Sequence, residues 1–161
     1  MNRAIVICGI LASCQSQASP LWRYSDAPGR VSAPDRDGDL VAFGGSDGLL
    51  LLTASGEKRC ALREYGPVAA RPVVEGQQVW FAAMGGQVLA IDSNCSVRWT
   101  SQPPLGRFTS DLLKFGDVLY AASTDGHVYA FRADTGKKRW QFPRAGVTPR
   151  RLRGGAAGPR R

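Results

Sequence analysis

Groups that commonly carry catalysis or bind metals are scarce in this sequence. It has one histidine and four cysteines in 161 residues. No CxxC or HExxH motif occurs, and no glycine-rich phosphate loop follows a strand pattern and opens a helix. His127 lacks an evident partner acid or nucleophile, so we expect it to be solvated or packed at a rim. The sequence therefore predicts no catalytic residue, no bound cofactor and no metal site.

Long hydrophobic runs are also missing, so no segment is long enough to span a bilayer as a helix. The N-terminus nevertheless has the pattern of an export signal, with basic MNR followed by apolar AIVICGILA. Leu11-Ala12-Ser13-Cys14 resembles the bacterial lipoprotein box, which implies cleavage before Cys14 and lipid on its thiol. The alternative is an ordinary signal peptide cut near Ala18. We expect a signal peptide over 1–13, a polar tether over 14–20, and a periplasmic protein held at the outer membrane by lipid.

Acidic residues are few, and the net charge is +8. Seven of these eight charges are carried by arginines near the two ends of the sequence, so the excess is not a property of the central region. Nucleic acid is therefore not expected as a partner. Residues 144–161 are basic, with few residues that favour strands, and we expect no regular structure there. The seven arginines are Arg3, Arg144, Arg150, Arg151, Arg153, Arg160 and Arg161.

What the sequence does contain is a repeat. Val118 to Trp140 predicts three short strands, separated by tight turns at Asp125-Gly126 and Asp134-Thr135-Gly136. Weaker copies lie upstream, and their landmarks keep step at intervals of 38 to 41 residues. The landmarks are Val41, Val79 and Val118; Gly48, Gly86 and Gly126; and Trp22, Cys60, Trp99 and Trp140. With a further strand before each copy, near Val31–Pro34, Arg71–Val74 and Thr109–Asp117, each unit has four strands in about 40 residues, which is typical of a propeller blade.

The fold class predicted is therefore all-β, with about three blades of four antiparallel strands over residues 21–143. The run Leu49–Leu52 is expected to be a strand buried on both faces. Since propellers close with about four to eight blades, three form an incomplete propeller. Three explanations remain open: assembly with copies of itself, blades supplied by another protein, or a partial gene product.

The units resemble the repeat of quinoprotein-type (PQQ-like) β-propellers, with DG, then TG, then W. The blade-motif residues are Asp47, Gly48, Gly85, Gly86, Trp99, Asp125, Gly126, Thr135, Gly136 and Trp140. The resemblance implies a scaffold, similar to BamB-type lipoproteins of outer-membrane protein assembly, whose partners are envelope proteins or further blades. The alternatives are a fragment of a PQQ-dependent dehydrogenase and a ligand-binding sensor ectodomain. We favour a non-enzymatic role in protein–protein interaction.

Three further sets of residues allow two interpretations each. Cys60 and Cys95 could form a disulfide between adjacent blades in an oxidising compartment, and a redox function is the weaker alternative. Asp35, Asp37 and Asp39 alternate like a calcium loop, but we expect a polar turn because the EF-hand glutamate is missing. Four aromatic residues could line a groove, although packing between blades is their more frequent fate. They are Trp80, Phe81, Phe108 and Phe115.

Overall fold

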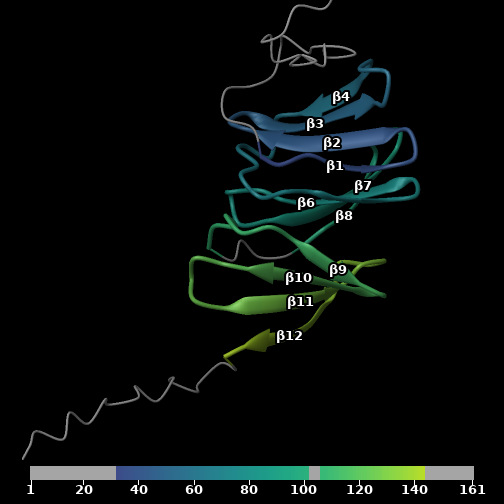
Figure 1. The fold of residues 1–161 in the computed structure, drawn as a ribbon. Helices are drawn as coiled ribbons and strands as arrows, with labels where there is room; N and C mark the ends of the chain where they lie inside the picture. The colour runs from purple at the N-terminus through teal and green to yellow at the C-terminus, as the bar shows by residue number, and fades with distance from the viewer. Residues whose placement is uncertain (1–31, 102–105, 144–161) are drawn as a thin grey trace, which may run out of the picture.

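The computed structural model describes residues 32–101 and 106–143, which form three four-stranded antiparallel sheets without a helix. Figure 1 shows the sheets stacked one on the next in chain order. The predicted all-β fold of propeller blades is thereby confirmed. The first blade contains β1 (Asp35–Asp37), β2 (Leu40–Gly45), β3 (Gly48–Thr53) and β4 (Lys58–Leu62). The second contains β5 (Val73–Glu75), β6 (Gln78–Ala82), β7 (Val88–Asp92) and β8 (Val97–Thr100). The third contains β9 (Leu113–Phe115), β10 (Val118–Ala122), β11 (Val128–Arg132) and β12 (Lys138–Phe142).

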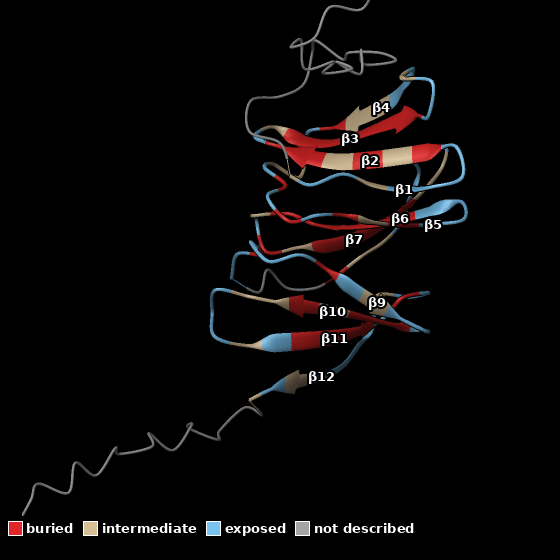
Figure 2. Ribbon diagram, viewed as in Figure 1, coloured by how far each residue is buried: buried red, intermediate tan, exposed pale blue. Residues whose placement is uncertain are grey.

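The central strands of each blade are the most apolar, as a sheet covered on both faces requires. Every residue of β3 is buried, which confirms the prediction for Leu49–Leu52. Figure 2 shows the contrast with β12, whose residues are intermediate or exposed.

Two hydrophobic clusters fill the spaces between blades. One joins the first blade to the second through side chains such as Leu51, Phe81 and Ile91. The other joins the second blade to the third through Trp80, Leu119 and Phe131. Because strand side chains alternate between faces, each inner blade contributes one residue set to each neighbour. The stack is therefore held together by the faces of its sheets.

The first strand of the first blade is not where the sequence indicated. We predicted this strand at Val31–Pro34 and a polar turn at Asp35–Asp39, but β1 comprises Asp35–Asp37 and pairs with β2. Asp35 lies opposite Ala42, as Val73 lies opposite Trp80 in the second blade. Pairing in the folded chain has overridden the low strand propensity of aspartate.

The loop at Asp125-Gly126 is one residue longer than the two-residue tight turn that an Asp-Gly pair between strands indicates. Ser123 donates its N–H to the carbonyl of His127, so the loop has three residues, and only Gly126 has a positive φ, at 87°. This arrangement is a common three-residue hairpin loop in which one residue takes the left-handed conformation.

Candidate functional site

The contact between the second and third blades centres on one backbone carbonyl. The indole N–H groups of Trp80 and Trp99 both donate to the carbonyl of Ala133, at 2.9 and 3.0 Å. Ala133 lies in the turn between β11 and β12 and is buried. Two donors from one blade therefore fix the turn of the next, while the indole rings supply apolar contact area.

Gly136 in the same turn allows the blades to approach. A Cβ atom built at this residue would overlap the indole ring of Trp99, and its φ of 66° lies in the left-handed region. Glycine satisfies both constraints, because it has no Cβ and adopts positive φ at little cost. Because the repeat places a tryptophan and a turn glycine in each blade, the tryptophan of the second blade packs against the turn glycine of the third.

A disulfide occupies the equivalent place between the first and second blades. Cys60 and Cys95 are bonded, with their Cα atoms 6.4 Å apart. Cys60 lies opposite Leu51 in the first blade, as Trp99 lies opposite Ala90 in the second. Cys95 comes four residues before Trp99, as Gly136 comes four residues before Trp140, and its φ is also positive, at 68°. The disulfide therefore stands where the next pair of blades has its tryptophan–glycine contact.

Two aspartate side chains of β1 join the first strand of the first blade to the first strand of the second blade, β5. Asp35 accepts the backbone N–H of Val74 at 2.8 Å and pairs with the guanidinium of Arg71. Asp37 accepts the backbone N–H of Gly76 at 2.7 Å. The alternating aspartates therefore stabilise the junction between blades. Among the residues that the structure describes, no cluster of three potential metal ligands is found.

His127 lies in a small polar group at the rim of the third blade. Its ring is 3.3 Å from a carboxylate oxygen of Asp125, and the Tyr129 hydroxyl donates to the same carboxylate at 2.6 Å. Burial, together with this hydrogen bond to a carboxylate, raises the pKa of Tyr129 to about 12. Burial alone would raise the pKa of Asp125, but hydrogen bonds from Tyr129 and its neighbours leave it below the ordinary value.

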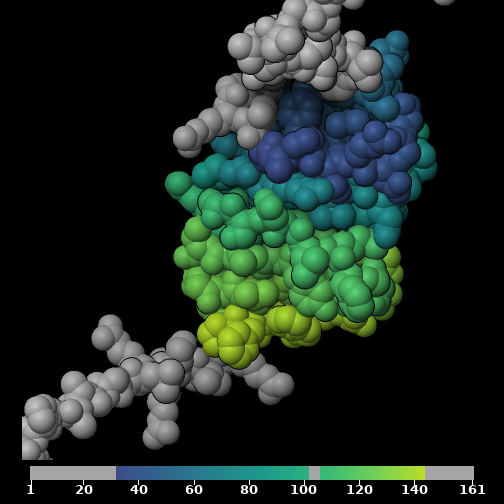
Figure 3. Space-filling view, viewed as in Figure 1, coloured from purple at the N-terminus to yellow at the C-terminus, as the bar shows by residue number. Residues whose placement is uncertain are grey.

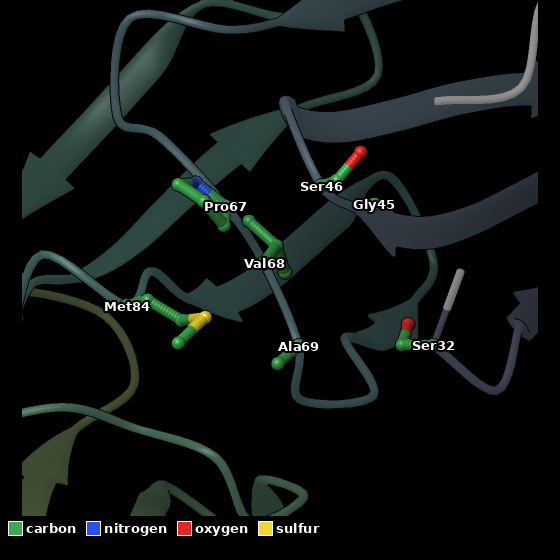
Figure 4. Close-up of a pocket in the computed structure, with 7 residues that line it drawn as sticks. All are labelled: Ser32, Gly45, Ser46, Pro67, Val68, Ala69 and Met84. Carbon is green, nitrogen blue, oxygen red and sulfur yellow. The ribbon is translucent and has the colours of Figure 1, made fainter. Parts of the chain in front are cut away.

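A cavity of about 610 Å³ lies at one rim, between the end of β2, the loop after β4 and the turn after β6 (Figure 4). Its seven lining residues carry no charge, and their only side-chain hydroxyls belong to two serines. Small-molecule sites usually combine an apolar wall with convergent polar groups, and these residues provide few. The lining residues are Ser32, Gly45, Ser46, Pro67, Val68, Ala69 and Met84.

The outer side of the third sheet is apolar and exposed. We call this surface the end face and define it by Leu113, Phe115, Tyr120, Val128, Trp140 and Phe142. Trp140 is 46% exposed and Phe115 78% exposed. In Figure 3 the third blade forms the lower end of the described structure, with the last strand coloured yellow. Large exposed apolar surfaces of this kind mark interaction sites.

Three of the four aromatic residues considered above are core residues, because Trp80, Phe81 and Phe108 are buried. Phe115 instead belongs to the end face. The sequence pattern did not identify the Ala133 carbonyl, since a backbone acceptor leaves no residue signature. It did predict that an open arc of three blades has apolar end faces, but it did not indicate which residues form them.

The remaining motif residues lie in turns. Asp47 precedes β3 and pairs with Arg63 at 3.1 Å, and Gly85 and Gly86 lie in the loop between β6 and β7. Thr135 donates a hydrogen bond to Asp134 within the β11–β12 turn. Cys14, Trp22, the expected signal peptide, the tether and the basic segment 144–161 lie outside the described residues.

Four-stranded blades linked through tryptophans and glycine turns define a β-propeller protein of the PQQ-like repeat class. Residues 10–142 match the family described as "Outer membrane protein assembly factor BamB", and the chain belongs to that family. A comparison with curated proteins found no match.

Solved structures agree on the fold. BamB from Moraxella catarrhalis is 26% identical, with a TM-score of 0.60 over 75% of this chain. The quinohemoprotein alcohol dehydrogenase ADHIIG from Pseudomonas putida HK5 is 17% identical with a TM-score of 0.59 over 69% of this chain, a likeness that shows the fold alone. The present chain spans 38% of that BamB and 20% of that dehydrogenase.

None of the described residues forms a helix of the length and hydropathy needed to cross a membrane.

Proposed function

We propose that this protein is a periplasmic lipoprotein scaffold that acts through protein–protein contacts in outer-membrane protein assembly, without catalysis. The observation that carries the proposal is the match of residues 10–142 to the BamB family. The identity of 26% to a BamB of known structure supports it. In this proposal Cys14 carries the lipid, residues 1–13 are removed, and residues 14–20 link the anchor to the blades.

The described surfaces suit such a role. Rim loops and an exposed sheet face are surfaces through which proteins of this architecture can bind partners. The end face offers apolar area, while the cavity in Figure 4 offers few polar groups for orienting a small molecule.

Membrane fractionation tests the anchor. The wild-type chain should sediment with outer membranes and incorporate labelled fatty acid, whereas Cys14→Ala should do neither. Cys8→Ala provides a matched control, because Cys8 lies within the segment expected to be removed. Equal fractionation of wild type and Cys14→Ala would contradict the lipoprotein proposal.

Co-purification tests the proposed assembly role. The membrane-anchored chain, solubilised in mild detergent, should retain components of the outer-membrane β-barrel assembly machinery. Cells lacking the protein should contain less folded outer-membrane β-barrel protein. Normal levels of folded barrels together with no co-purification would exclude this function, even if the lipid anchor were verified.

A further inference from the structure

The two junctions between blades are closed differently on the side of the fourth strands, β4, β8 and β12, which we call the outer side. Between the second and third blades, the indoles of Trp80 and Trp99 donate to the carbonyl of Ala133. In the first blade the places of these tryptophans are taken by Ala42 and Cys60, whose side chains have no N–H group. The first junction therefore lacks the two indole hydrogen bonds that close the second.

The acceptor of those hydrogen bonds has an equivalent at the first junction. Ser93 begins the turn of the second blade as Ala133 begins that of the third, since each donates its N–H to the residue that precedes the second strand of its own blade. Residues 35–62 of the first blade contain no tryptophan, so no indole of that blade reaches the Ser93 carbonyl. What joins the two blades near this turn is the bond between Cys60 and Cys95.

The inner side of the first junction, formed by β1 and β5, is held without the disulfide. Asp35 accepts the backbone N–H of Val74 at 2.8 Å, and Asp37 accepts that of Gly76 at 2.7 Å. A cluster of buried apolar side chains lies between these hydrogen bonds and the disulfide. Breaking the disulfide should therefore leave the blades attached along the inner side and release only the outer side.

The disulfide lies at the margin of the buried cluster. Cys60 and Cys95 are both partly exposed, and Asn94 and Ser96 on either side of Cys95 are exposed. Thiol–disulfide exchange begins when a thiolate attacks one of the two sulfurs, so access from solvent is its first requirement. Partial exposure at both cysteines meets this requirement.

The turn that carries Cys95 is held by bonds that do not involve its sulfur. The Asp92 carboxylate accepts the backbone N–H groups of Asn94 and Ser96, each at 2.9 Å, and the Asp92 carbonyl accepts that of Cys95. Cys60 is held in the ladder between β3 and β4. After reduction both thiols should therefore stay near their places for most of the time, so that the bond can form again.

We propose that the Cys60–Cys95 disulfide is a reversible latch that is opened by a dithiol protein of the thioredoxin class. In the exchange the two thiols of the donor are oxidised to a disulfide, while Cys60 and Cys95 are reduced to thiols. Two electrons and two protons pass from the donor to this chain, so the step needs no other reactant. The reduced junction opens transiently on its outer side, about the hydrogen bonds of the inner side. This inference rests on neither the proposed lipid anchor nor the proposed assembly role.

Thiol labelling of the folded full chain tests the exchange. Reduced thioredoxin is added without denaturant, the thiols are alkylated, and the peptides that contain Cys60 and Cys95 are identified by mass spectrometry. Both cysteines should be labelled while the circular dichroism remains that of the folded chain. Removing thioredoxin and adding oxidised glutathione should restore the disulfide. Labelling that requires urea, or a bond that does not form again, would overturn the proposal.

Hydrogen exchange tests whether reduction opens the outer side. In the reduced chain the amides of β4 and of residues 92–96 should exchange about tenfold or more faster than in the oxidised chain, because a covalent bond no longer prevents local opening. The amides of β5, on the inner side, and of β12, in the third blade, should change little. Unchanged exchange at β4 would show that the junction stays closed without the bond. Loss of protection in all three blades would show that the disulfide braces the whole fold. Either result would overturn the latch.

Two double variants separate the latch from other effects of the reductant. Cys60→Ser with Cys95→Ser should show the fast exchange of the reduced chain without any added thiol. Cys60→Trp with Cys95→Gly is the matched control, because it introduces the non-covalent contact of the second junction and has no disulfide at this place to reduce. Its exchange at β4 should not respond to thioredoxin. A response equal to that of the wild type would show that thioredoxin acts elsewhere in the chain, and the proposal would fail.

Discussion

At the scale of single residues, the turns of the repeat differ in what they demand of glycine. Gly126 and Gly136 both have positive φ, at 87° and 66°. Around Gly126 a Cβ would meet no atom within 4 Å, whereas at Gly136 it would overlap the Trp99 ring. The glycine of the motif therefore meets a backbone requirement at both turns, and at Gly136 it also meets a packing requirement.

Alanine substitution should separate these two roles. Gly126→Ala should lower the free energy of unfolding by about 1 kcal/mol, from backbone conformation alone. Gly136→Ala should cost about 3 kcal/mol or more, because the Trp99 contact between blades must also open. Urea unfolding of the two variants measures the difference. Equal costs would mean that the approach of Trp99 is not tight in solution.

The hydroxyl of Tyr129 gives a residue-scale prediction at alkaline pH. Its pKa in the folded chain is about 12, above the ordinary value of about 10. A raised pKa means that the folded state holds the proton more tightly, so this contribution to stability is complete below about pH 10 and is lost as the pH rises through 12. Tyr129→Phe should remove this part of the alkaline decline in thermal stability. It should also remove from the ultraviolet titration a phenol that ionises near pH 12, while Tyr65→Phe should leave that phenol in place.

At the scale of strands and blades, the repeat was predictable because its period survives small insertions. The four-strand units and the buried β3 follow from alternation and apolar runs that any blade needs. The position of β1 was not predictable from Asp35–Asp37, whose residues disfavour strands. These aspartates belong to a strand because their carboxylates bind backbone N–H groups of the next blade, a contact that exists only after folding.

The disulfide is a second contact between blades whose partners are brought together only by folding, and its removal gives a prediction for blade stability. Its two cysteines are 35 residues apart, and only the blade register shows that they replace a tryptophan and a glycine. Cys60→Ser with Cys95→Ser should lower the free energy of unfolding by about 3–4 kcal/mol, as expected for releasing such a loop. Cys60→Trp with Cys95→Gly should recover part of that loss by restoring the non-covalent contact.

The recovery should be partial because of Ala42. This small residue occupies in the first blade the place that Trp80 has in the second, so the added indole has fewer neighbouring side-chain atoms to pack against. Chemical unfolding under non-reducing conditions compares the wild type with the two double variants. If the tryptophan–glycine variant is no more stable than the serine variant, the two junctions are not interchangeable.

At the scale of the whole molecule, the chain is a linear stack in which each blade contacts only its neighbours. The second blade is covered on both faces by its neighbours, whereas the third blade is covered on one face, and its other face holds exposed residues such as Trp140. This property explains why Trp99 and Trp140, equivalent in sequence, differ in their surroundings. The sequence predicted the equivalence, but exposure depends on whether another blade follows in the folded stack.

The difference between these two tryptophans should therefore appear as a difference in stability. Trp99→Ala removes an indole that packs on Gly136 and donates to Ala133, and it should cost about 2–4 kcal/mol. Trp140→Ala changes a residue that is 46% exposed and whose ring lies beside that of Tyr120, and it should cost about 1 kcal/mol or less. Thermal and urea unfolding of the isolated chain measure both costs. A large cost at Trp140 would show that its face is already covered in solution. A small cost would show that the face around Trp140 is uncovered in the isolated chain.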